Sequence, residues 1–398
     1  MSRSFDVMVA GHLCLDIIPA FPAGQAAPDL DHLLPPGSLV TVGPAAVSTG
    51  GAVSNTGIAL RKLGNRVCFS ARVGDDAFGS VVVRLMERSG GRQGIRAVAP
   101  AVTSYTVVIA PAGRDRCFLH HPGANDEFCA DDVDGDLLCR SRLFHFGYPP
   151  IMRRMYADGG AELKKLFRRA KQAGCVTSCD MVAVDPGSDA ARAPWKKILA
   201  GILPSVDLFL PSFEEAVCLL DPEGFFRQKR AGENLIWASP PDRYAGVASC
   251  LLEMGAQVVV LKAADRGIYL RTSPEVRFPP ESGVRPENAA AWAGRELWCP
   301  ALRADEIASA TGAGDACVAG FLTAFLKGLG PEECLRYAAI VGWENLHALD
   351  ATTGIRTWEE TVALFHAEMP VNDPELAISG WEWSAGKGVW VGPHDAAG

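Results

Sequence analysis

Two hydrophobic patterns alternate along most of the chain. Short apolar runs rich in β-branched residues predict buried strands, and apolar residues spaced three and four apart predict helices with one buried face. We expect strands at 5–10, 67–73, 143–146, 176–180, 206–210 and 258–262. Helices are expected at 55–63, 77–88, 156–173, 195–203, 244–254 and 331–349. This alternation predicts an α/β fold with a mainly parallel sheet and helices on both of its faces.

Segments with a different pattern interrupt this order. Residues 19–49 are rich in proline, glycine and alanine, and they are predicted to leave the core, with a strand at 38–42. Residues 104–109 and 116–120 flank a glycine-containing turn and predict a hairpin.

Three later segments also lack the regular alternation. The polar stretches 221–243 and 273–294 are expected to be surface loops. Residues 380–392 alternate large and small side chains around a Ser-Ala-Gly-Lys-Gly turn, which predicts a second hairpin. Its tryptophans are expected to cover apolar surface on the body or on a partner chain.

Composition narrows the class of protein. The 398 residues allow one large domain or two average ones, and a net charge of −8 argues against a nucleic-acid-binding surface. No apolar stretch is long enough to predict a membrane span. The 12 cysteines are scattered without a Cys-x-x-Cys pair, which is typical of reduced thiols and not of a zinc site. We therefore expect a cytoplasmic protein without nucleic-acid or membrane partners.

Small residues and one acid precede a helix late in the chain. Gly312, Ala313 and Gly314 come directly before Asp315, and an apolar stripe of helical period follows. Backbone amides at a helix N-terminus attract anions, and small side chains let an anion approach them. Asp315 is either a catalytic acid–base group or a complement to the helix charge, worth roughly 0.3–1 kcal/mol.

A second stretch gives this turn a context. Residues 48–79 contain Gly50-Gly51, then Asn55, then Leu63-Gly64 before the next predicted strand. Together with residues 312–315, this stretch resembles the two signatures of the ribokinase (PfkB) family of carbohydrate and nucleoside kinases. The resemblance covers roughly residues 5–365 and places both signatures in the family's order.

The resemblance implies a fold and a division of the chain. It implies a ribokinase-like three-layer α/β/α domain over residues 1–370, with a small β lid built from about 17–49 and 100–122. Residues 371–398 form a separate tail. A lid matters in a kinase because closure excludes water, which competes with the substrate as phosphoryl acceptor.

The resemblance also assigns catalytic roles. Asp315 is the general base that takes the proton of an acceptor hydroxyl as it attacks the γ-phosphate of ATP. The amides of Gly312, Ala313 and Gly314 form an anion hole for the phosphoryl oxygens. Thr311 either adds a hydroxyl near the phosphates or caps the turn.

Four residues are implied to bind the substrate. Asp16 follows the first strand and binds substrate hydroxyls, unless it is a turn or cap residue. Gly50 and Gly51 let the backbone approach the substrate, and Asn55 is either a substrate ligand or a helix N-cap.

Three residues are implied to bind ATP and Mg²⁺. Glu215 helps to hold the water shell of Mg²⁺, although Ser212 stands where the family has asparagine. Gly267 matches the nucleotide-side loop, where Ala264 replaces a usual glycine. Lys262 either reaches a phosphate or is an ordinary surface lysine.

Two further positions bear on ions and substrate. Ser309 replaces an aspartate of the family's monovalent-cation loop, which is completed near 348–355, so K⁺ dependence is left open. Asp350 either compensates or is a solvent-facing loop residue. His120 and His121 follow the predicted hairpin, and we interpret them as lid or core residues in preference to substrate ligands.

Three functions are compatible with these residues. The favoured one is ATP-dependent phosphorylation of a hydroxymethyl group on a sugar-like small molecule, with a nucleoside kinase as a close variant. The alternative from another class is a non-catalytic binding or scaffold protein, which the departures at Ser212, Ala264 and Ser309 favour. An oxidoreductase is disfavoured, because no Gly-x-Gly-x-x-Gly follows the first strand. Whether the chain forms a homodimer is left open.

Overall fold

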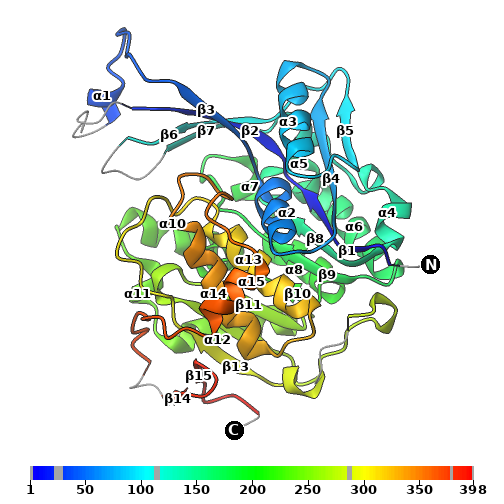
Figure 1. Cartoon of the computed structure of the whole chain (residues 1–398), viewed down its shortest axis with the longest axis vertical. Helices are drawn as coiled ribbons and strands as arrows, with labels where there is room; N and C mark the ends of the chain where they lie inside the picture. Colours follow the sequence, from blue (N-terminus) through cyan, green and yellow to red (C-terminus); the bar gives the residue numbers. More distant parts are fainter. Residues whose placement is uncertain (1–2, 22–29, 112–116, 285–288, 377–379, 397–398) are drawn as a thin grey trace.

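The computed structural model describes residues 3–21, 30–111, 117–284, 289–376 and 380–396. Within these residues the main sheet has 11 strands, in the order β14-β15-β13-β12-β11-β10-β9-β8-β1-β4-β5. A separate sheet of 4 strands has the order β3-β2-β6-β7. Figure 1 shows the small sheet extending away from the body, above the helices of the main domain.

The centre of the main sheet is parallel and its far edge is antiparallel. The parallel strands are β1 (Phe5–Gly11), β4 (Val67–Gly74), β5 (Ile95–Val98), β8 (Ser141–Gly147), β9 (Val176–Asp180), β10 (Leu208–Phe209) and β11 (Val258–Lys262). The antiparallel strands are β12 (Ile268–Thr272), β13 (Glu296–Cys299), β14 (Glu382–Ser384) and β15 (Val389–Val391). The order reverses at β1, which lies between β4 and β8, and such a switch point is where α/β sheets bind ligands.

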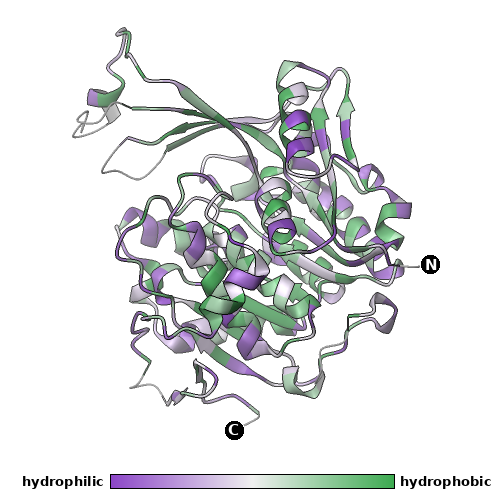
Figure 2. Ribbon diagram, in the orientation of Figure 1, coloured by the Kyte–Doolittle hydropathy of each residue, from purple (hydrophilic) through white to green (hydrophobic). Residues whose placement is uncertain are grey.

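Helices cover both faces of this sheet. One face packs against α6 (Ala161–Gln172), α8 (Trp195–Ile202), α9 (Phe213–Leu220) and α12 (Pro241–Glu253). The other packs against α2 (Ala52–Lys62), α3 (Ala77–Arg88), α13 (Ala313–Leu326) and α14 (Pro331–Asn345). Met8 belongs to the first core and its neighbour Val9 to the second, as expected from the period of a strand. Figure 2 shows apolar residues concentrated along the central strands. The predicted three-layer fold is confirmed.

The remaining helices are short or peripheral. They are α1 (Leu30–Leu33), α4 (Gly135–Cys139), α5 (Arg153–Tyr156), α7 (Asp189–Arg192), α10 (Pro222–Arg230), α11 (Leu235–Ala238) and α15 (Trp358–Phe365). Among the helices of the described residues, none combines the length and the apolar character that spanning a bilayer requires.

The small sheet consists of β2 (Cys14–Pro19), β3 (Ala45–Gly50), β6 (Tyr105–Ile109) and β7 (Cys117–His121). The strand predicted at 38–42 is wrong, because β2 pairs with residues 45–50 and not with that apolar run. Strand identity here depends on the pairing partner more than on local propensity. The predicted hairpin is present as β6 and β7, although residues 112–116 between them lie outside the described residues.

The surface loop predicted at 221–243 is also wrong. Most of it is helical, because Asp221 caps α10 by accepting from the Gly224 amide at 3.0 Å and Phe225 is buried. The apolar stripe of this helix is too short for its period to be recognised in the sequence. The 273–294 segment, where described, contains only 3₁₀ turns at Pro280–Ser282 and Ala289–Trp292.

Several predicted helix boundaries shift. The helix predicted at 55–63 begins at Ala52, the one at 156–173 begins at Ala161, and the one at 331–349 ends at Asn345. Caps and backbone turns determine where these helices begin and end, and the spacing of apolar residues does not predict those boundaries.

The tail forms an antiparallel pair on the body. Val391 of β15 pairs with Leu297 of β13, so the main sheet continues into the tail. Trp381 is buried and its ring lies 6.0 Å from that of Trp298. The Asp395 carboxylate accepts from the Arg295 guanidinium at 2.9 Å, which ties the end of the tail to β13.

Candidate active site

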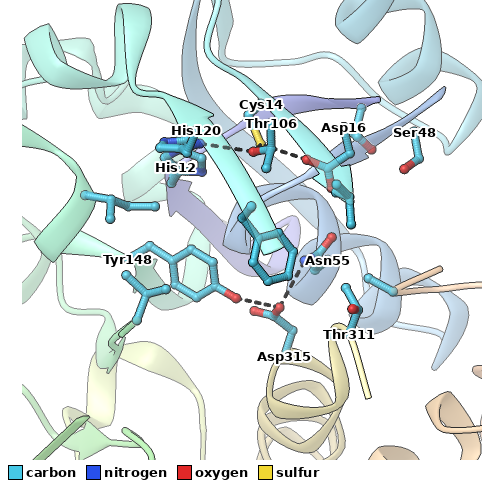
Figure 3. Close-up of a pocket in the computed structure, with 18 of the residues that line it drawn as sticks. His12, Cys14, Asp16, Ser48, Asn55, Thr106, His120, Tyr148, Thr311 and Asp315 are labelled. Atoms are coloured by element: carbon cyan, nitrogen blue, oxygen red, sulfur yellow. Dashed lines mark hydrogen bonds between the residues drawn. The ribbon is translucent and has the colours of Figure 1, made fainter. Parts of the chain in front are cut away.

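A cavity of about 1410 Å³ lies between the small sheet and the N-terminus of α13 (Figure 3). It is larger than most pockets for a single small molecule, which span roughly 300–1,000 Å³. Of the residues that the sequence implied to be catalytic, substrate-binding or ATP-binding, those that line it are Asp16, Gly51, Asn55, Thr311, Gly312 and Asp315. Both sequence signatures therefore meet at one cavity.

Asp315 lies in the first turn of α13 and is only 3% exposed. Its Oδ2 accepts from Asn55 Nδ2 at 3.0 Å and from the Tyr148 hydroxyl at 2.7 Å. Its Oδ1 accepts from the Thr56 hydroxyl at 2.9 Å. All three donors are neutral and come from other elements, so the carboxylate is held at the cavity by contacts beyond its own helix.

The turn before Asp315 has the geometry of an anion-binding site. Gly312 is the N-cap of α13 with φ 78°, and a Cβ there would lie 2.4 Å from the Cβ of Ala351. Only glycine fits this backbone and this contact. The Ala313 amide already donates to the Ala310 carbonyl at 3.2 Å. The amides of Gly312 and Gly314 have no hydrogen-bond partner among the described residues, so they are the better candidates for an anion.

Asp16 lies within β2, so the interpretation of a turn or cap residue is wrong. Burial raises its pKa to about 6. Its carboxylate accepts a hydrogen bond from the Thr106 hydroxyl, which in turn contacts His120 Nδ1 at 3.0 Å (Figure 3). On the adjacent strand, a Cβ at Gly50 would lie 2.3 Å from Asp16 Oδ2. Because Gly50 has no side chain, there is room for the Asp16 carboxylate beside it.

Gly51 and Asn55 begin α2. Gly51 is the N-cap, with φ 91°, so the interpretation of Asn55 as the N-cap is wrong. A Cβ at Gly51 would lie 2.5 Å from His12 Nδ1. Asn55 lies one turn later, where its Oδ1 accepts from the Ser54 hydroxyl at 3.2 Å and its Nδ2 reaches Asp315. Asn55 thus joins α2 to α13 at the cavity.

Sequence analysis did not select several of the residues that line the cavity. His12, Thr106 and Tyr148 line the cavity and were not selected. His120 was interpreted as a lid or core residue; it lies on β7 of the small sheet and lines the cavity, whereas the His121 ring lies 5.5 Å from that of Tyr105. Burial lowers the pKa of His12, and burial together with the neighbouring His121 lowers the pKa of His120 to about 4, so both rings are neutral at pH 7.

Only weak sequence signals could have found these four. The His12 and Tyr148 positions directly follow strands, where ligand sites of α/β folds gather. Thr106 and His120 are brought to the cavity by the pairing of β6 with β2 and β7, which no local sequence pattern predicts.

Lys262 is not a surface lysine. Its side chain is 12% exposed and its Nζ donates to Asp180 Oδ1 and to the Leu210 carbonyl, each at 2.5 Å. Burial alone would lower the pKa of Lys262, but the charges of Asp180, Glu215 and Asp315 outweigh it and raise the pKa. A Cβ at Gly314 would lie 3.6 Å from Lys262 Cε, so a permanent positive charge stands beside the Gly312–Gly314 turn.

The remaining predicted cofactor residues lie outside the cavity lining. Glu215 Oε2 accepts from the Ser212 amide at 2.7 Å, and the Ser212 hydroxyl accepts from the Glu215 amide at 3.1 Å, which forms a capping box at α9. Gly267 has φ 107°, and a Cβ there would lie 2.1 Å from the Cys299 carbonyl oxygen. Ala264 has φ 47°, so the turn keeps a left-handed residue where the family has glycine.

The donor set is compatible with Mg²⁺ but not with a metal held by protein alone. The described residues contain no group of three or more His, Cys, Asp or Glu side chains suited to a metal ion. Mg²⁺ at phosphates usually needs only one or two carboxylates, because waters and phosphate oxygens fill the other positions. The carboxylates of Glu215 and Asp180, whose charges both act on Lys262, meet that requirement.

The ammonium group of Lys62 contacts the loop that the resemblance associates with a monovalent cation. Ser309 Oγ accepts from the Thr311 amide at 2.9 Å. Asp350 accepts from the amides of Thr352 and Thr353, at 2.8 and 2.6 Å, so it caps its own loop instead of compensating for Ser309. Lys62 Nζ donates to the carbonyls of Thr352 at 2.7 Å and of Thr353 and Ile355 at 3.4 Å.

The chain is similar to kinases in sequence and in fold. It is 23% identical over 296 residues to an uncharacterized sugar kinase of Archaeoglobus fulgidus, covering 74% of this chain and 97% of that protein. Fructokinase-2 of Oryza sativa subsp. japonica is 28% identical over 162 residues, which cover 39% of this chain and 47% of that protein. The match to that fructokinase therefore spans about half of its length.

Solved structures agree on the fold. The ribokinase of Arabidopsis thaliana complexed with ribose and ATP has a TM-score of 0.67 and 18% identity, covering 92% of this chain and 100% of that one. The adenosine kinase of Sinorhizobium meliloti has a TM-score of 0.64 and 18% identity, covering 90% and 99%. At these identities the likeness shows the fold alone.

A family model described as pfkB family carbohydrate kinase matches residues 24–357. This match covers most of the chain and includes both signatures. The chain therefore belongs to the pfkB family of carbohydrate kinases and is a phosphotransferase whose acceptor is an alcohol group.

Proposed function

We propose that the protein transfers the γ-phosphoryl group of ATP to a hydroxymethyl group of a neutral sugar or sugar-like molecule. The observation that carries this proposal is the placement of Asp315. Its carboxylate lies next to the amides of Gly312 and Gly314 and faces the same cavity as Asp16. A base, an anion site and a site for hydroxyl groups thus share one cavity.

The proposed reaction uses these groups in order. The hydroxyl of the sugar donates to Asp315, and its oxygen attacks the γ-phosphorus. The proton passes to the Asp315 carboxylate as the new O–P bond forms, and ADP leaves with the electrons of the broken bond. A general base of this kind contributes about 10²–10⁴-fold to the rate.

The negative charge of the transferring group needs positive partners. The amides of Gly312 and Gly314 point from a helix N-terminus, and the ammonium of Lys262 lies beside them. When bound, Mg²⁺ neutralises phosphate oxygens, and Glu215 and Asp180 are the residues that would hold its water shell. This donor set and membership of the family support ATP and Mg²⁺ as cofactors. One structure with a similar fold is solved in complex with ATP and Mg²⁺.

The cavity favours an uncharged acceptor. Among the described residues that line it, the carboxylates are Asp16, Asp126, Asp185, Asp315 and Asp350, and Arg88 is the base. Because His12 and His120 are neutral at pH 7, an anionic substituent would meet mainly carboxylates. Asp16 and Thr106 instead offer hydrogen bonds to hydroxyl groups. We therefore infer a sugar without phosphate or carboxylate.

A nucleoside acceptor is the second candidate, and one observation favours it. Phe118 and Val108 line the cavity from the small sheet, and Tyr148 lines it from the body. These side chains could contact the flat face of a base. The polar wall around Asp16 favours the sugar, because a site built for several hydroxyls rejects molecules that lack them.

Thermal stabilisation separates these candidates. Neutral sugars and nucleosides are each added with a nonhydrolysable ATP analogue and Mg²⁺, and the melting temperature is measured. We expect stabilisation by at least one neutral sugar, and phosphorylation of that sugar when ATP replaces the analogue. Stabilisation by nucleosides alone would instead indicate a nucleoside kinase. Stabilisation without any turnover would support the non-catalytic alternative.

A further inference from the structure

Tyr148 contacts the proposed base, although no sequence signature includes it. It follows β8 with φ 71°, a left-handed backbone that is uncommon for a residue with a side chain. The turn is fixed by its neighbours, because a Cβ at Gly147 would lie 2.1 Å from the Cβ of Ala52 and Pro149 follows directly. Backbone strain of this kind is retained where a side chain must be held at a functional site.

The Tyr148 hydroxyl occupies one specific position on the base. It donates to Asp315 Oδ2 at 2.7 Å, the usual length for such a bond. Burial and the charge of Asp315 raise the pKa of Tyr148 well above its usual value, so the hydroxyl keeps its proton and remains a donor. Figure 3 shows Tyr148 and Asn55 approaching the same oxygen of Asp315.

The Tyr148 hydroxyl fills one of the hydrogen-bond acceptor sites of the Asp315 carboxylate. A carboxylate oxygen has two lone pairs, and Oδ2 already accepts from Tyr148 and from Asn55 Nδ2 at 3.0 Å. Oδ1 accepts from Thr56 at 2.9 Å. An incoming hydroxyl that donates to Oδ2 must therefore displace one of its two donors. Both residues line the cavity, but Asn55 is buried in α2, whereas Tyr148 is only partly buried.

We propose that the Tyr148 hydroxyl occupies the place of the acceptor hydroxyl on Asp315 and excludes water from it until the sugar binds. This inference rests on the proposed function. Without such a group, a water molecule donating to Oδ2 would be activated by the same base and would attack ATP. Rotation of the Tyr148 side chain frees Oδ2 without moving the fixed turn of the backbone.

The test is the Tyr148→Phe variant, which keeps the ring and removes the hydroxyl. We expect hydrolysis of ATP without sugar to rise about tenfold, the effect of one hydrogen bond to a charged group. The KM for the sugar falls, because the sugar no longer displaces a donor. In the Tyr148→Phe/Asp315→Asn double variant the additional hydrolysis disappears.

Tyr244→Phe is the matched control. The Tyr244 hydroxyl is also a donor in the protein interior, to the Ile236 carbonyl at 2.9 Å, but Tyr244 is not a lining residue of the cavity. Its removal is expected to leave sugar-independent hydrolysis unchanged.

The outcomes separate the two proposals. If the wild type phosphorylates a sugar but Tyr148→Phe hydrolyses ATP no faster, the inference about Tyr148 is wrong and the kinase assignment stands. A fall in kcat with an unchanged KM would also overturn it, since that result indicates a residue that only orients Asp315. If the wild type phosphorylates no alcohol, the proposed function fails first.

Discussion

The two sides of the cavity are built differently. On one side, Asp315, Asn55 and Thr56 are buried at the junction of α2 and α13, which rest on the main sheet. On the other, Asp16 and Thr106 lie on the small sheet, whose strand β7 is exposed along its length, with Phe118 56% and Leu119 58% exposed. The proposed chemistry therefore lies on a rigid core, and the proposed substrate selection lies on a sheet with few core contacts.

This contrast predicts different kinetic effects from changes on the two sides. Changes near α13 are expected to reduce kcat, because the base and the anion site act in the transition state. Changes on the small sheet are expected to raise KM, because they remove contacts that the sugar makes before and during reaction.

The largest effect is expected for Asp315→Asn. The variant keeps the size of the side chain but cannot accept a proton, so kcat falls about 10²–10⁴-fold. ATP binding and the melting temperature are expected to stay near wild-type values. Steady-state kinetics measure the loss, and Asp305→Asn, which removes an exposed carboxylate, is the control. Near-normal turnover by Asp315→Asn would refute its role as the base.

A smaller effect, on KM, is expected for Asp16→Asn. Hydrogen bonds to charged groups are worth about 1.5–3 kcal/mol, so KM for the sugar rises about 10–100-fold while kcat changes less. An equal loss in kcat with unchanged KM would remove the distinction between the two sides of the cavity.

The same carboxyl makes sugar binding depend on pH. Burial raises the pKa of Asp16 to about 6 from 3.8, so its charged form is lost as pH falls through 6. Sugar affinity is expected to decrease in that range and to become flat in Asp16→Asn. Because the folded protein disfavours the charged form, Asp16→Asn also stabilises the sugar-free protein above pH 6 and not below pH 3.8. Titrations followed by melting temperature test both statements.

Gly50→Ala tests the space around Asp16 more gently. The new Cβ would lie 2.3 Å from the Asp16 carboxylate, which must then shift, so we expect a higher KM with little loss of kcat. Gly246→Ala in α12 is the control, because a Cβ there has nothing within 4 Å. Equal effects of the two substitutions would show that Gly50 serves only the backbone.

The smallest effect is expected from monovalent cations. Activity is expected to require Mg²⁺ and to end with its removal by a chelator. K⁺ is expected to change activity only weakly, because Lys62 already contacts the Thr352, Thr353 and Ile355 carbonyls. In Lys62→Met those carbonyls lose their cation, and we expect K⁺ to restore part of the lost activity. Assays in Na⁺, K⁺ and choline buffers decide this. A strong K⁺ activation of the wild type would contradict it.

The two sides also differ in how well the sequence predicted them. On the α13 side, Asp315 and Asn55 belong to contiguous motifs, and alternating strands and helices gave the three-layer core. On the small sheet, Asp16 acquires its partner Thr106 only through the register of β2 with β6. The position of β3 likewise follows from its own pairing with β2, and no local pattern predicts it.

Long-range contacts also explain what was missed near the base. Tyr148 reaches Asp315 across 167 residues, and Lys262 reaches Asp180 across 82. Neither pair has a spacing that a local motif could express. The helix α10 was missed for the opposite reason, because its short apolar face gives too few positions for a period to emerge.

The stoichiometry of products tests the central claim most directly. The protein is incubated with ATP, Mg²⁺ and the neutral sugar that stabilises it best, and ADP and phosphorylated sugar are quantified together by mass spectrometry. The proposed function predicts one phosphorylated sugar for each ADP, with the phosphate on the hydroxymethyl oxygen and both products lost in Asp315→Asn. ADP without phosphorylated sugar, or phosphorylated sugar at an undiminished rate in Asp315→Asn, would contradict it.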